Sequence, residues 1–184
     1  MNNIDNYFQT LRRLKFSQLF YKIYYKFMPI KIIKFNNVKY SFPLKKLIKF
    51  IKKKGFIYSN NFYIFNFLNI QKKIDTFKIE ENKLPKLWIY NLHYFDYLND
   101  YDNSKSNFDA KINLIYKWIE FSEQSYITCA FEPYPTSLRI VNWIKWIVLN
   151  DIKDDRIFNS LYSQLNYLNK SIEYHILANH LFAN

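Results

Sequence analysis

Apolar residues recur at helical spacing in the first part of the chain. From Ile4 to Phe27 most steps are of three or four residues, through Tyr7, Leu11, Leu14, Leu19 and Ile23. Pro29 then interrupts the run, because proline cannot donate the backbone hydrogen bond of a helix interior. The pattern predicts an N-terminal helix over residues 4–27, which can break near Ser17.

Strand-like patterns follow this helix in two places. Residues 31–35 and 38–42 flank Asn36-Asn37, and asparagine tolerates the left-handed backbone of a tight turn, so this segment predicts a β-hairpin. From Phe56 to Ile79 aromatic and β-branched residues alternate irregularly, which predicts strands or extended segments.

A lysine-rich amphipathic segment separates the two strand-like stretches. Pro43 to Lys54 places leucine and isoleucine on one side and lysines elsewhere, and Gly55 suits a left-handed cap at its end. The segment predicts a short helix. It could lie on an anionic membrane surface, although a packed helix with a solvated lysine face is the favoured interpretation.

From Trp88 onward the apolar spacing is helical. It predicts four helices, at about 87–99, 107–122, 136–150 and 155–182. Leu84-Pro85-Lys86 is the expected junction, which divides the chain into a leader, 1–86, and a helical region, 87–184. The fold class expected is mainly α with a small α+β leader, and four successive helices suit a bundle or part of a helical toroid.

The last predicted helix changes character along one face. Leu161, Leu165, Leu168 and Ile172 form an apolar stripe, and the same steps continue to His175 and Asn179, beside which lies His180. Polar groups at the end of a core face either meet buried partners or form a site. Two adjacent polar residues with a third one turn earlier favour a site.

Composition and charge narrow the function classes. Of the 184 residues 49% are hydrophobic and 21% aromatic, which excludes a disordered chain. No secretory signal or uncharged stretch long enough for a transmembrane helix is present, so the sequence alone predicts a cytoplasmic protein. Cys129 is the only cysteine, which excludes an internal disulfide and favours a buried apolar role. The three histidines lack metal-ligand spacing, so neither a metal nor a cofactor is expected.

The net charge of +12 is unevenly distributed. Residues 1–86 carry 19 Lys/Arg and 4 Asp/Glu, whereas residues 87–184 carry 8 and 11. A basic surface attracts polyanions such as acidic polysaccharides, nucleic acids and anionic lipids. Biased codon usage explains the lysine excess equally well.

Three segments carry specific motifs. They are residues 88–98 (WIYNLHYFDYL), 132–146 (EPYPTSLRIVNWIKW) and 173–184 (EYHILANHLFAN), and residues 11–19 (LRRLKFSQL) precede them. In this order and spacing they closely resemble the N-terminal part of heparinase II/III-like proteins, relatives of alginate and heparan sulfate lyases. The resemblance implies an incomplete α/α toroid, which in family members continues into more helices and a β-sandwich domain.

The resemblance also implies a reaction. Family members cleave uronic-acid-containing chains by metal-independent β-elimination, which removes the proton beside the carboxylate and expels the 4-linked oxygen. By the family's pattern Asn179 would neutralise the carboxylate and His180 would orient it or share its charge. The tyrosine that transfers the proton in many relatives lies in a later helix, so these residues are expected to be inactive alone.

Candidate substrate contacts come from the earlier motifs. His93 and Tyr94 share a helix side with Tyr90 and Tyr97, where aromatic faces could flank sugar rings. An aromatic stripe at this spacing is more often core. Tyr134, His175 and Arg139 complete the set of candidate substrate contacts.

Arg139 is the cation expected at the site. Thr136 or Ser137 could cap the helix that follows the prolines, which would place Arg139 in its first turn, where a positive charge is unfavourable. A partner is therefore expected, either a carboxylate such as Glu132 or an acidic sugar. The two partners are weighed equally.

Two other functions compete with a lyase portion. A non-catalytic module could bind anionic glycan through its aromatic helices and basic leader. Contact of the basic half with nucleic acid or a membrane ranks last, because no nucleic-acid motif accompanies the charge. In the favoured interpretation the partner is an acidic polysaccharide, and an exposed toroid edge predicts self-association.

Overall fold

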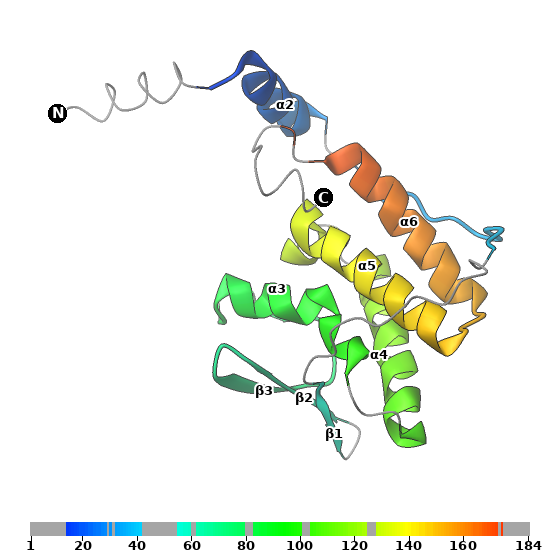
Figure 1. Ribbon diagram of the computed structural model, residues 1–184. Coiled ribbons are helices and arrows are strands. Elements are labelled where there is room, and N and C mark those ends of the chain that lie inside the picture. The colour runs from blue at the N-terminus through cyan, green and yellow to red at the C-terminus, as the bar shows by residue number, and fades with distance from the viewer. Residues whose placement is uncertain are drawn as a thin grey trace.

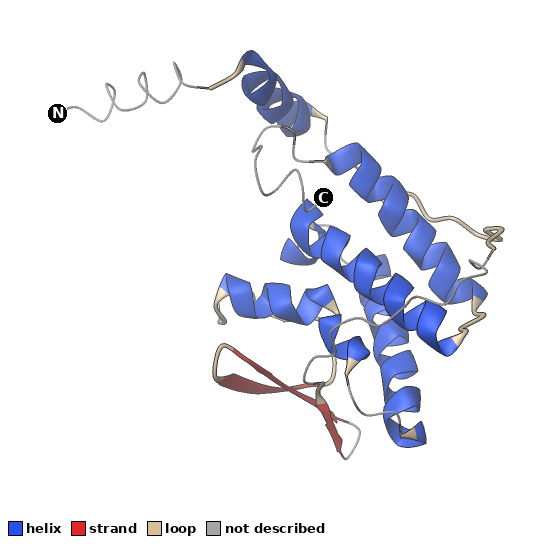
Figure 2. Cartoon of the chain, viewed as in Figure 1, coloured by secondary structure: helices blue, strands red, loops and turns tan. Residues whose placement is uncertain are grey.

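The computed structural model describes most of the chain. The described residues are 14–28, 30, 32–41, 55–59, 62–79, 83–100, 104–124, 128–172 and 174. In order, the elements are α2 (Phe16–Phe27), β1 (Ile57–Ser59), β2 (Phe62–Phe67), β3 (Ile70–Ile74), α3 (Lys86–Tyr94), the 3-10 helix η1 (Asp96–Asn99), α4 (Lys105–Gln124), the 3-10 helix η2 (Cys129–Phe131), α5 (Pro133–Asn150) and α6 (Asp155–Ser171). The predicted mainly helical fold with a small strand-containing part is confirmed (Figure 1, Figure 2).

The sheet has three antiparallel strands in the order β1-β2-β3. Leu68 and Asn69 connect β2 to β3 with φ angles of 54° and 60°, the left-handed pair of a two-residue hairpin turn. Tyr63 and Phe65 alternate inward and are buried, whereas the middle of β3 is exposed. The strands predicted between residues 56 and 79 are therefore confirmed, and one face of the sheet joins the core.

The hairpin predicted around Asn36-Asn37 is wrong. Asn37 has the left-handed backbone expected of a turn, with φ 56°, but residues 32–41 contain no strand. This segment, which we name the strap, lies along α6. Phe35 N donates to Ser163 Oγ at 3.2 Å and Val38 N donates to Asn159 Oδ1 at 3.0 Å. Helix side chains instead of a second strand thus accept the hydrogen bonds of these two backbone donors.

The N-terminal helix is confirmed where the structure describes it. α2 begins at Phe16 after the extended residue Lys15, which lies within the predicted helix 4–27. The predicted residues 4–13 of this helix, and the amphipathic helix predicted over 43–54, lie outside the described residues. α2 contacts the end of α6, where the Tyr25 hydroxyl donates to Ile172 O at 2.8 Å.

One continuous core joins the sheet to the helices. Trp88, Trp118 and Trp143 have no exposed surface, and the rings of Phe65 and Tyr97 pack 4.8 Å apart. α5 packs against α3, α6 and both 3-10 helices (Figure 1). The Cys129 thiol is buried, as predicted. Residues on both sides of the boundary expected at 86/87 share this core.

Helix ends differ from the sequence prediction in three places. Phe95, with φ 57°, separates α3 from η1 within the predicted helix 87–99. α5 begins at Pro133 because prolines fit the first helical turn. α6 ends at Ser171 and Ile172 is extended, with ψ 130°. The predicted helix 155–182 is therefore too long, and the apolar stripe cannot be extrapolated to His175 along a continuous helix.

Gly55, the only glycine in the sequence, lies where a side chain would clash with a neighbouring residue. Gly55 does not have the predicted left-handed backbone. A Cβ at this position would lie 2.0 Å from Oδ2 of Asp100. Asp100 forms an ion pair with Lys111, in which Oδ1 lies 2.5 Å from Nζ and both side chains are buried. Gly55 thus leaves room for a buried carboxylate, which the sequence alone did not indicate.

Candidate functional site

Arg139 occupies the centre of the fold. Its side chain has no exposed surface. Nε donates to Gln164 Oε1 at 2.7 Å, one terminal nitrogen donates to Ala130 O at 2.9 Å, and the other donates to Thr136 Oγ1 at 3.2 Å. The guanidinium also lies 4.0 Å from the ring centre of Trp118. The contacts connect α5 to α4, α6 and the segment before α5.

The carboxylate partner expected for Arg139 is not found among the described residues. Its contacts among the described residues are neutral acceptors and an aromatic ring, and Arg139 is the seventh residue of α5 instead of lying in the first turn. Thr136 and Ser137 do not cap α5, because that helix begins before them. Burial lowers the pKa of Arg139 to about 9, which still leaves it charged at neutral pH.

Glu132 pairs with other residues. Lys86 Nζ lies 2.7 Å from Glu132 Oε1, and the Tyr90 hydroxyl donates to the other carboxylate oxygen. Burial, and then this hydrogen bond to Glu132, raise the pKa of Tyr90 to about 12, whereas Lys86 lowers it less. A phenol with so high a pKa is protonated at neutral pH and acts as a hydrogen-bond donor.

His93 is a core residue. Its imidazole is buried, its ring stacks on Phe121, and Nδ1 accepts a 3.3 Å hydrogen bond from Trp118 Nε1. Burial, and secondarily the Arg139 charge, lower the pKa of His93 well below 6.5. In this conformation the side chain is neutral and offers no face to a ligand.

The predicted tyrosines lie together. The rings of Tyr94 and Tyr134 meet edge to face at 5.7 Å, and Tyr90 lies 6.2 Å from Tyr94. Tyr94 is buried, whereas Tyr90 and Tyr134 are half-buried. Asn142 Nδ2 donates to Tyr94 O at 2.9 Å, so residues of 88–98 and 132–146 contact each other directly. His175, Asn179 and His180 lie outside the described residues.

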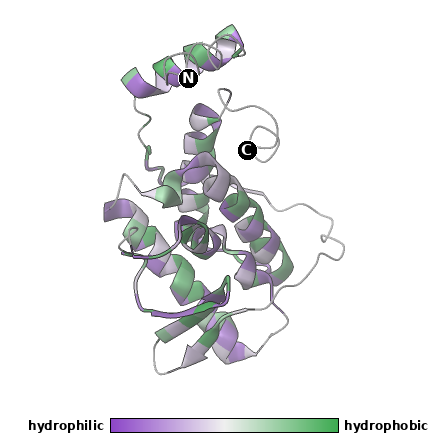
Figure 3. Ribbon diagram, turned by 90° about the vertical axis from the view of Figure 1, so that its left-hand side faces the viewer, coloured by the Kyte–Doolittle hydropathy of each residue, from purple (hydrophilic) through white to green (hydrophobic). Residues whose placement is uncertain are grey.

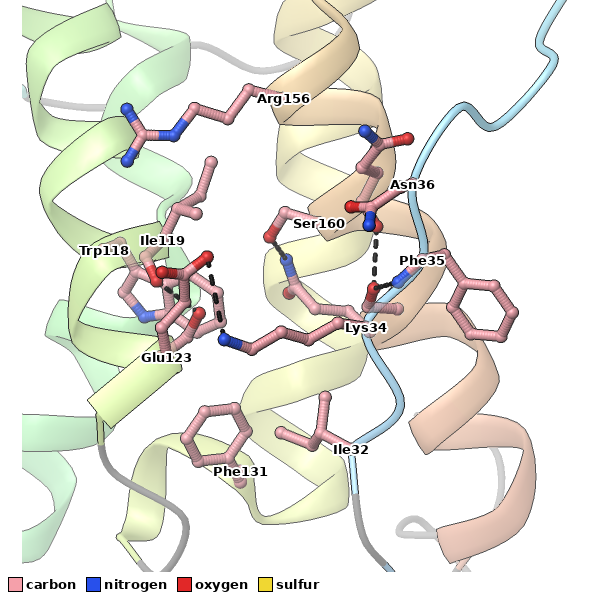
Figure 4. Close-up of a pocket in the computed structure, with 14 residues that line it drawn as sticks. Ile32, Lys34, Phe35, Asn36, Trp118, Ile119, Glu123, Phe131, Arg156 and Ser160 are labelled. Atoms are coloured by element: carbon pink, nitrogen blue, oxygen red, sulfur yellow. Dashed lines mark hydrogen bonds and ion pairs between the residues drawn. The ribbon is translucent and has the colours of Figure 1, made fainter.

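A cleft of about 250 Å³ lies elsewhere, between α4, α6 and the strap (Figure 4). Its lining combines aromatic and aliphatic side chains with hydroxyls, amides and charges. The residues are Ile32, Lys34, Phe35, Asn36, Trp118, Ile119, Ser122, Glu123, Phe131, Arg156, Asn159, Ser160, Ser163 and Gln164. Ligand pockets typically pair such apolar surface with a few placed polar groups.

Two cations border this cleft. Lys34 reaches from the strap across to Glu123 of α4, and their charged atoms are 3.9 Å apart (Figure 4). Arg156 of α6 lies 3.1 Å from Glu120. Both pairs are about half exposed, and such pairs are worth only about 0–1 kcal/mol. A ligand carboxylate can therefore replace either glutamate at small cost.

Arg139 supports the cleft from behind. It binds Gln164 and Trp118, and both of these residues line the cleft. Because Gln164 Oε1 accepts from Arg139, its amide nitrogen points to Ser160 Oγ, which is 3.3 Å away. Arg139 is thus a positioning residue for the cleft, and a buried positive charge beneath it favours an anionic ligand.

Sequence reasoning missed the cleft. Ser160 follows Arg156 by four residues, and Ser163 and Gln164 follow Ser160 by three and four. This polar face of α6 could have been recognised beside the apolar stripe. Lys34 was assigned to a strand, and its cross-cleft reach depends on how the strap packs. Its role was not visible in local sequence.

The described residues show neither a metal-binding cluster nor a membrane-spanning helix. Among the described residues, no group of three or more His, Cys, Asp or Glu side chains is placed to hold a metal ion. Across the same residues, no helix is long and apolar enough to cross a bilayer.

Comparison of the chain with protein families, curated proteins and solved structures gave no match.

Proposed function

We propose that the chain is the N-terminal portion of a polysaccharide lyase that acts on uronic-acid-containing glycan by metal-independent β-elimination. In this proposal the helices form part of an incomplete α/α toroid of the heparinase II/III-like kind. The described residues bind the acidic chain. Asn179 and His180 neutralise the uronate carboxylate, and the proton-transferring tyrosine belongs to a later helix.

One observation carries the proposal. Arg139, which lies in the 132–146 motif, positions Gln164 and Trp118 in the wall of a cleft bordered by Lys34 and Arg156. The motif that carries the family resemblance therefore supports, from behind, a cleft whose lining could bind an acidic sugar. The volume of about 250 Å³ is below the range of about 300–1,000 Å³ for drug-sized ligands, and it suits one sugar ring.

The lining matches a uronate residue group by group. Lys34 and Arg156 can bind a carboxylate, and Arg does so in bidentate fashion. Ser122, Ser160 and Asn159 offer hydroxyl and amide groups to sugar hydroxyls. The apolar side chains of Ile32 and Phe131 face each other across one end of the cleft and can contact the ring's C–H groups (Figure 4).

A non-catalytic glycan-binding module is the second candidate. It is favoured by the burial of His93 and Tyr94, which leaves fewer predicted substrate contacts on the surface. Both candidates bind acidic glycan, and they differ in whether Asn179 and His180 contact the uronate carboxylate.

Calorimetric titration with uronate oligosaccharides tests the proposal. We expect binding to alginate or heparan sulfate oligosaccharides, and at least tenfold weaker binding to the same oligosaccharides after their carboxylates are reduced to alcohols. Loss of a hydrogen bond to a charged group predicts that Asn179→Ala weakens binding about tenfold. Equal affinity for native and carboxyl-reduced oligosaccharides would contradict the proposal.

Two further measurements separate the candidates and locate the site. If the chain is a non-catalytic binding module, Asn179→Ala should leave the affinity for the oligosaccharide unchanged. If it is a lyase portion, the same substitution should weaken the affinity about tenfold. Lys34→Gln should weaken binding about fivefold, and Lys153→Gln provides the matched control, because Lys153 is an exposed lysine paired with Asp151 outside the cleft.

A further inference from the structure

α2 presents an apolar stripe to solvent. Phe16, Phe20, Ile23 and Phe27 are 84%, 52%, 56% and 76% exposed. Their steps of four, three and four residues place them on one face of the helix. No residue of α2 is buried, and the helix lies at one end of the molecule (Figure 3). Single exposed apolar residues are ordinary, but a continuous aromatic stripe marks an interaction surface.

The opposite side of α2 attaches it to the rest of the protein. Tyr25 donates to Ile172 O at 2.8 Å, and the rings of Tyr21 and Tyr174 are 4.9 Å apart. Tyr25 follows Phe16 by nine residues, which is two and a half helical turns, so these two side chains project in opposite directions. The helix is thus held in place by its tyrosine side while the phenylalanines face outward.

Lysines border the stripe on one side. Lys22 and Lys26 are exposed and lie one turn apart on a side of α2 between the phenylalanine and tyrosine faces. α2 contains no acidic residue, and Lys15 precedes it. An apolar aromatic face bordered by lysines is the pattern of helices that lie in the plane of an anionic membrane.

The length of α2 distinguishes lying on a bilayer from crossing it. Its 12 residues span about 18 Å, whereas the hydrocarbon core is about 30 Å thick. Phenylalanines can enter the boundary of the acyl chains while the lysine ammonium groups stay among the headgroups. Charge complementarity identifies the partner of this face. An anionic membrane attracts the lysines beside the stripe, whereas a purely apolar partner would not interact with their charges.

We propose that α2 is an interfacial helix that docks the protein on an anionic phospholipid bilayer. The phenylalanine stripe supplies apolar burial, and Lys22 and Lys26 supply the preference for negative charge. Docking would hold the cleft, which lies between α4, α6 and the strap, near a membrane surface.

Vesicle flotation of the full chain tests this inference. We expect the protein to float with phosphatidylcholine vesicles that contain phosphatidylglycerol, and to float much less with phosphatidylcholine alone. Each lysine near an anionic surface contributes about fivefold in partition, so Lys22→Gln with Lys26→Gln should lower it more than tenfold. Lys72→Gln with Lys78→Gln, two exposed lysines elsewhere in the basic half, is the charge control.

The apolar stripe is tested separately. Phe16→Ser combined with Phe27→Ser removes the two most exposed rings and should lower partition at least tenfold without loss of folding. Val141→Ser combined with Leu149→Ser, each 46% exposed on α5, is the matched control and should leave partition unchanged. A Phe16→Trp reporter should shift its emission to the blue with anionic vesicles only.

Two results would overturn the inference. One is equal flotation of the α2 variants and their controls. The other is dimerisation of the wild-type chain, measured by sizing across dilution, that the phenylalanine variant abolishes while no vesicle binding occurs. In that case the stripe is a contact between two protein chains.

Discussion

Nε of Arg139 donates a 2.7 Å hydrogen bond to Oε1 of Gln164, and this contact joins α5 to the cleft wall on α6. The guanidinium is fully buried and is satisfied by neutral acceptors among the described residues. A buried cation of this kind is stable only because nearly every donor has a partner and the Trp118 ring faces it. Stability and site geometry therefore depend on the same side chain.

Arg139→Met should destabilise the protein strongly. Methionine is of similar length, but Gln164 Oε1 and Ala130 O would lose their donor in a dry interior. We expect the free energy of unfolding to fall by about 3–5 kcal/mol, measured by urea denaturation. Arg156→Met, which removes an exposed ion pair, is the control and should cost less than about 1 kcal/mol. Equal losses would show that Arg139 is not a central contact.

The lowered pKa of His93 makes the free energy of unfolding depend on pH. Its pKa in the folded protein is lowered well below 6.5 by burial and by Arg139, so the unfolded chain binds a proton more readily. The stability from neutral His93 is therefore complete above pH 6.5 and is lost as the pH falls below that value. Between pH 6.5 and about 5, the free energy of unfolding should fall by up to about 1.4 kcal/mol per pH unit.

The matched variant for this titration is His93→Gln. Glutamine can still accept the hydrogen bond from Trp118 Nε1 but does not titrate. Urea denaturation across this pH window should show a smaller slope for the variant than for the wild-type chain. Identical slopes would mean that His93 is protonated in the folded protein.

Element type was predictable because it depends on local periodicity. The spacing of apolar residues predicted a helix that includes α2, and it predicted the helices from Lys86 onward. The helices from Lys86 onward bury one face in the common core, whereas α2 has no buried residue. The hairpin predicted for the strap was wrong because tertiary contacts determine its conformation. Asn36-Asn37 carries a strong turn pattern, but Asn159 and Ser163 of α6 satisfy the flanking backbone, and local sequence does not contain those partners.

Side-chain roles were less predictable than elements. The burial of Arg139 depends on Gln164, which is 25 residues away, and on backbone oxygens freed where η2 meets α5. Lys34 and Glu123 meet only because the strap crosses the gap between α4 and α6. Charge spacing along one segment cannot reveal such contacts, so the cleft could be recognised only after folding.

Gly55→Ala should be unusually costly for a glycine substitution. The new Cβ would lie 2.0 Å from Oδ2 of Asp100, so either the backbone or the carboxylate must move. Movement would weaken the buried pair between Asp100 and Lys111, whose charged atoms are 2.5 Å apart. We expect a loss of about 2–4 kcal/mol in the free energy of unfolding, measured by urea denaturation.

A double-mutant cycle identifies the cause of that loss. In an Asp100→Ala background the carboxylate is absent and only the Cβ of residue 100 remains close, at 3.0 Å, so Gly55→Ala should cost less than about 1 kcal/mol. Additive losses would assign the effect of Gly55→Ala to backbone conformation instead of to the carboxylate.

Glu123→Gln should strengthen binding of acidic glycan, whereas Lys34→Gln should weaken it. Glu123 holds Lys34 across the cleft at 3.9 Å and repels a ligand carboxylate, so removing its charge frees the ammonium group for the ligand. We expect about a two- to fivefold gain in affinity for Glu123→Gln, because half-exposed pairs contribute up to about 1 kcal/mol. Calorimetric titration with uronate oligosaccharides measures both variants, and both effects should shrink as salt is added. A gain for Glu123→Gln that persists in the Lys34→Gln background would show that the glutamate acts by repulsion alone, and a loss of affinity for Glu123→Gln would place the ligand outside this cleft.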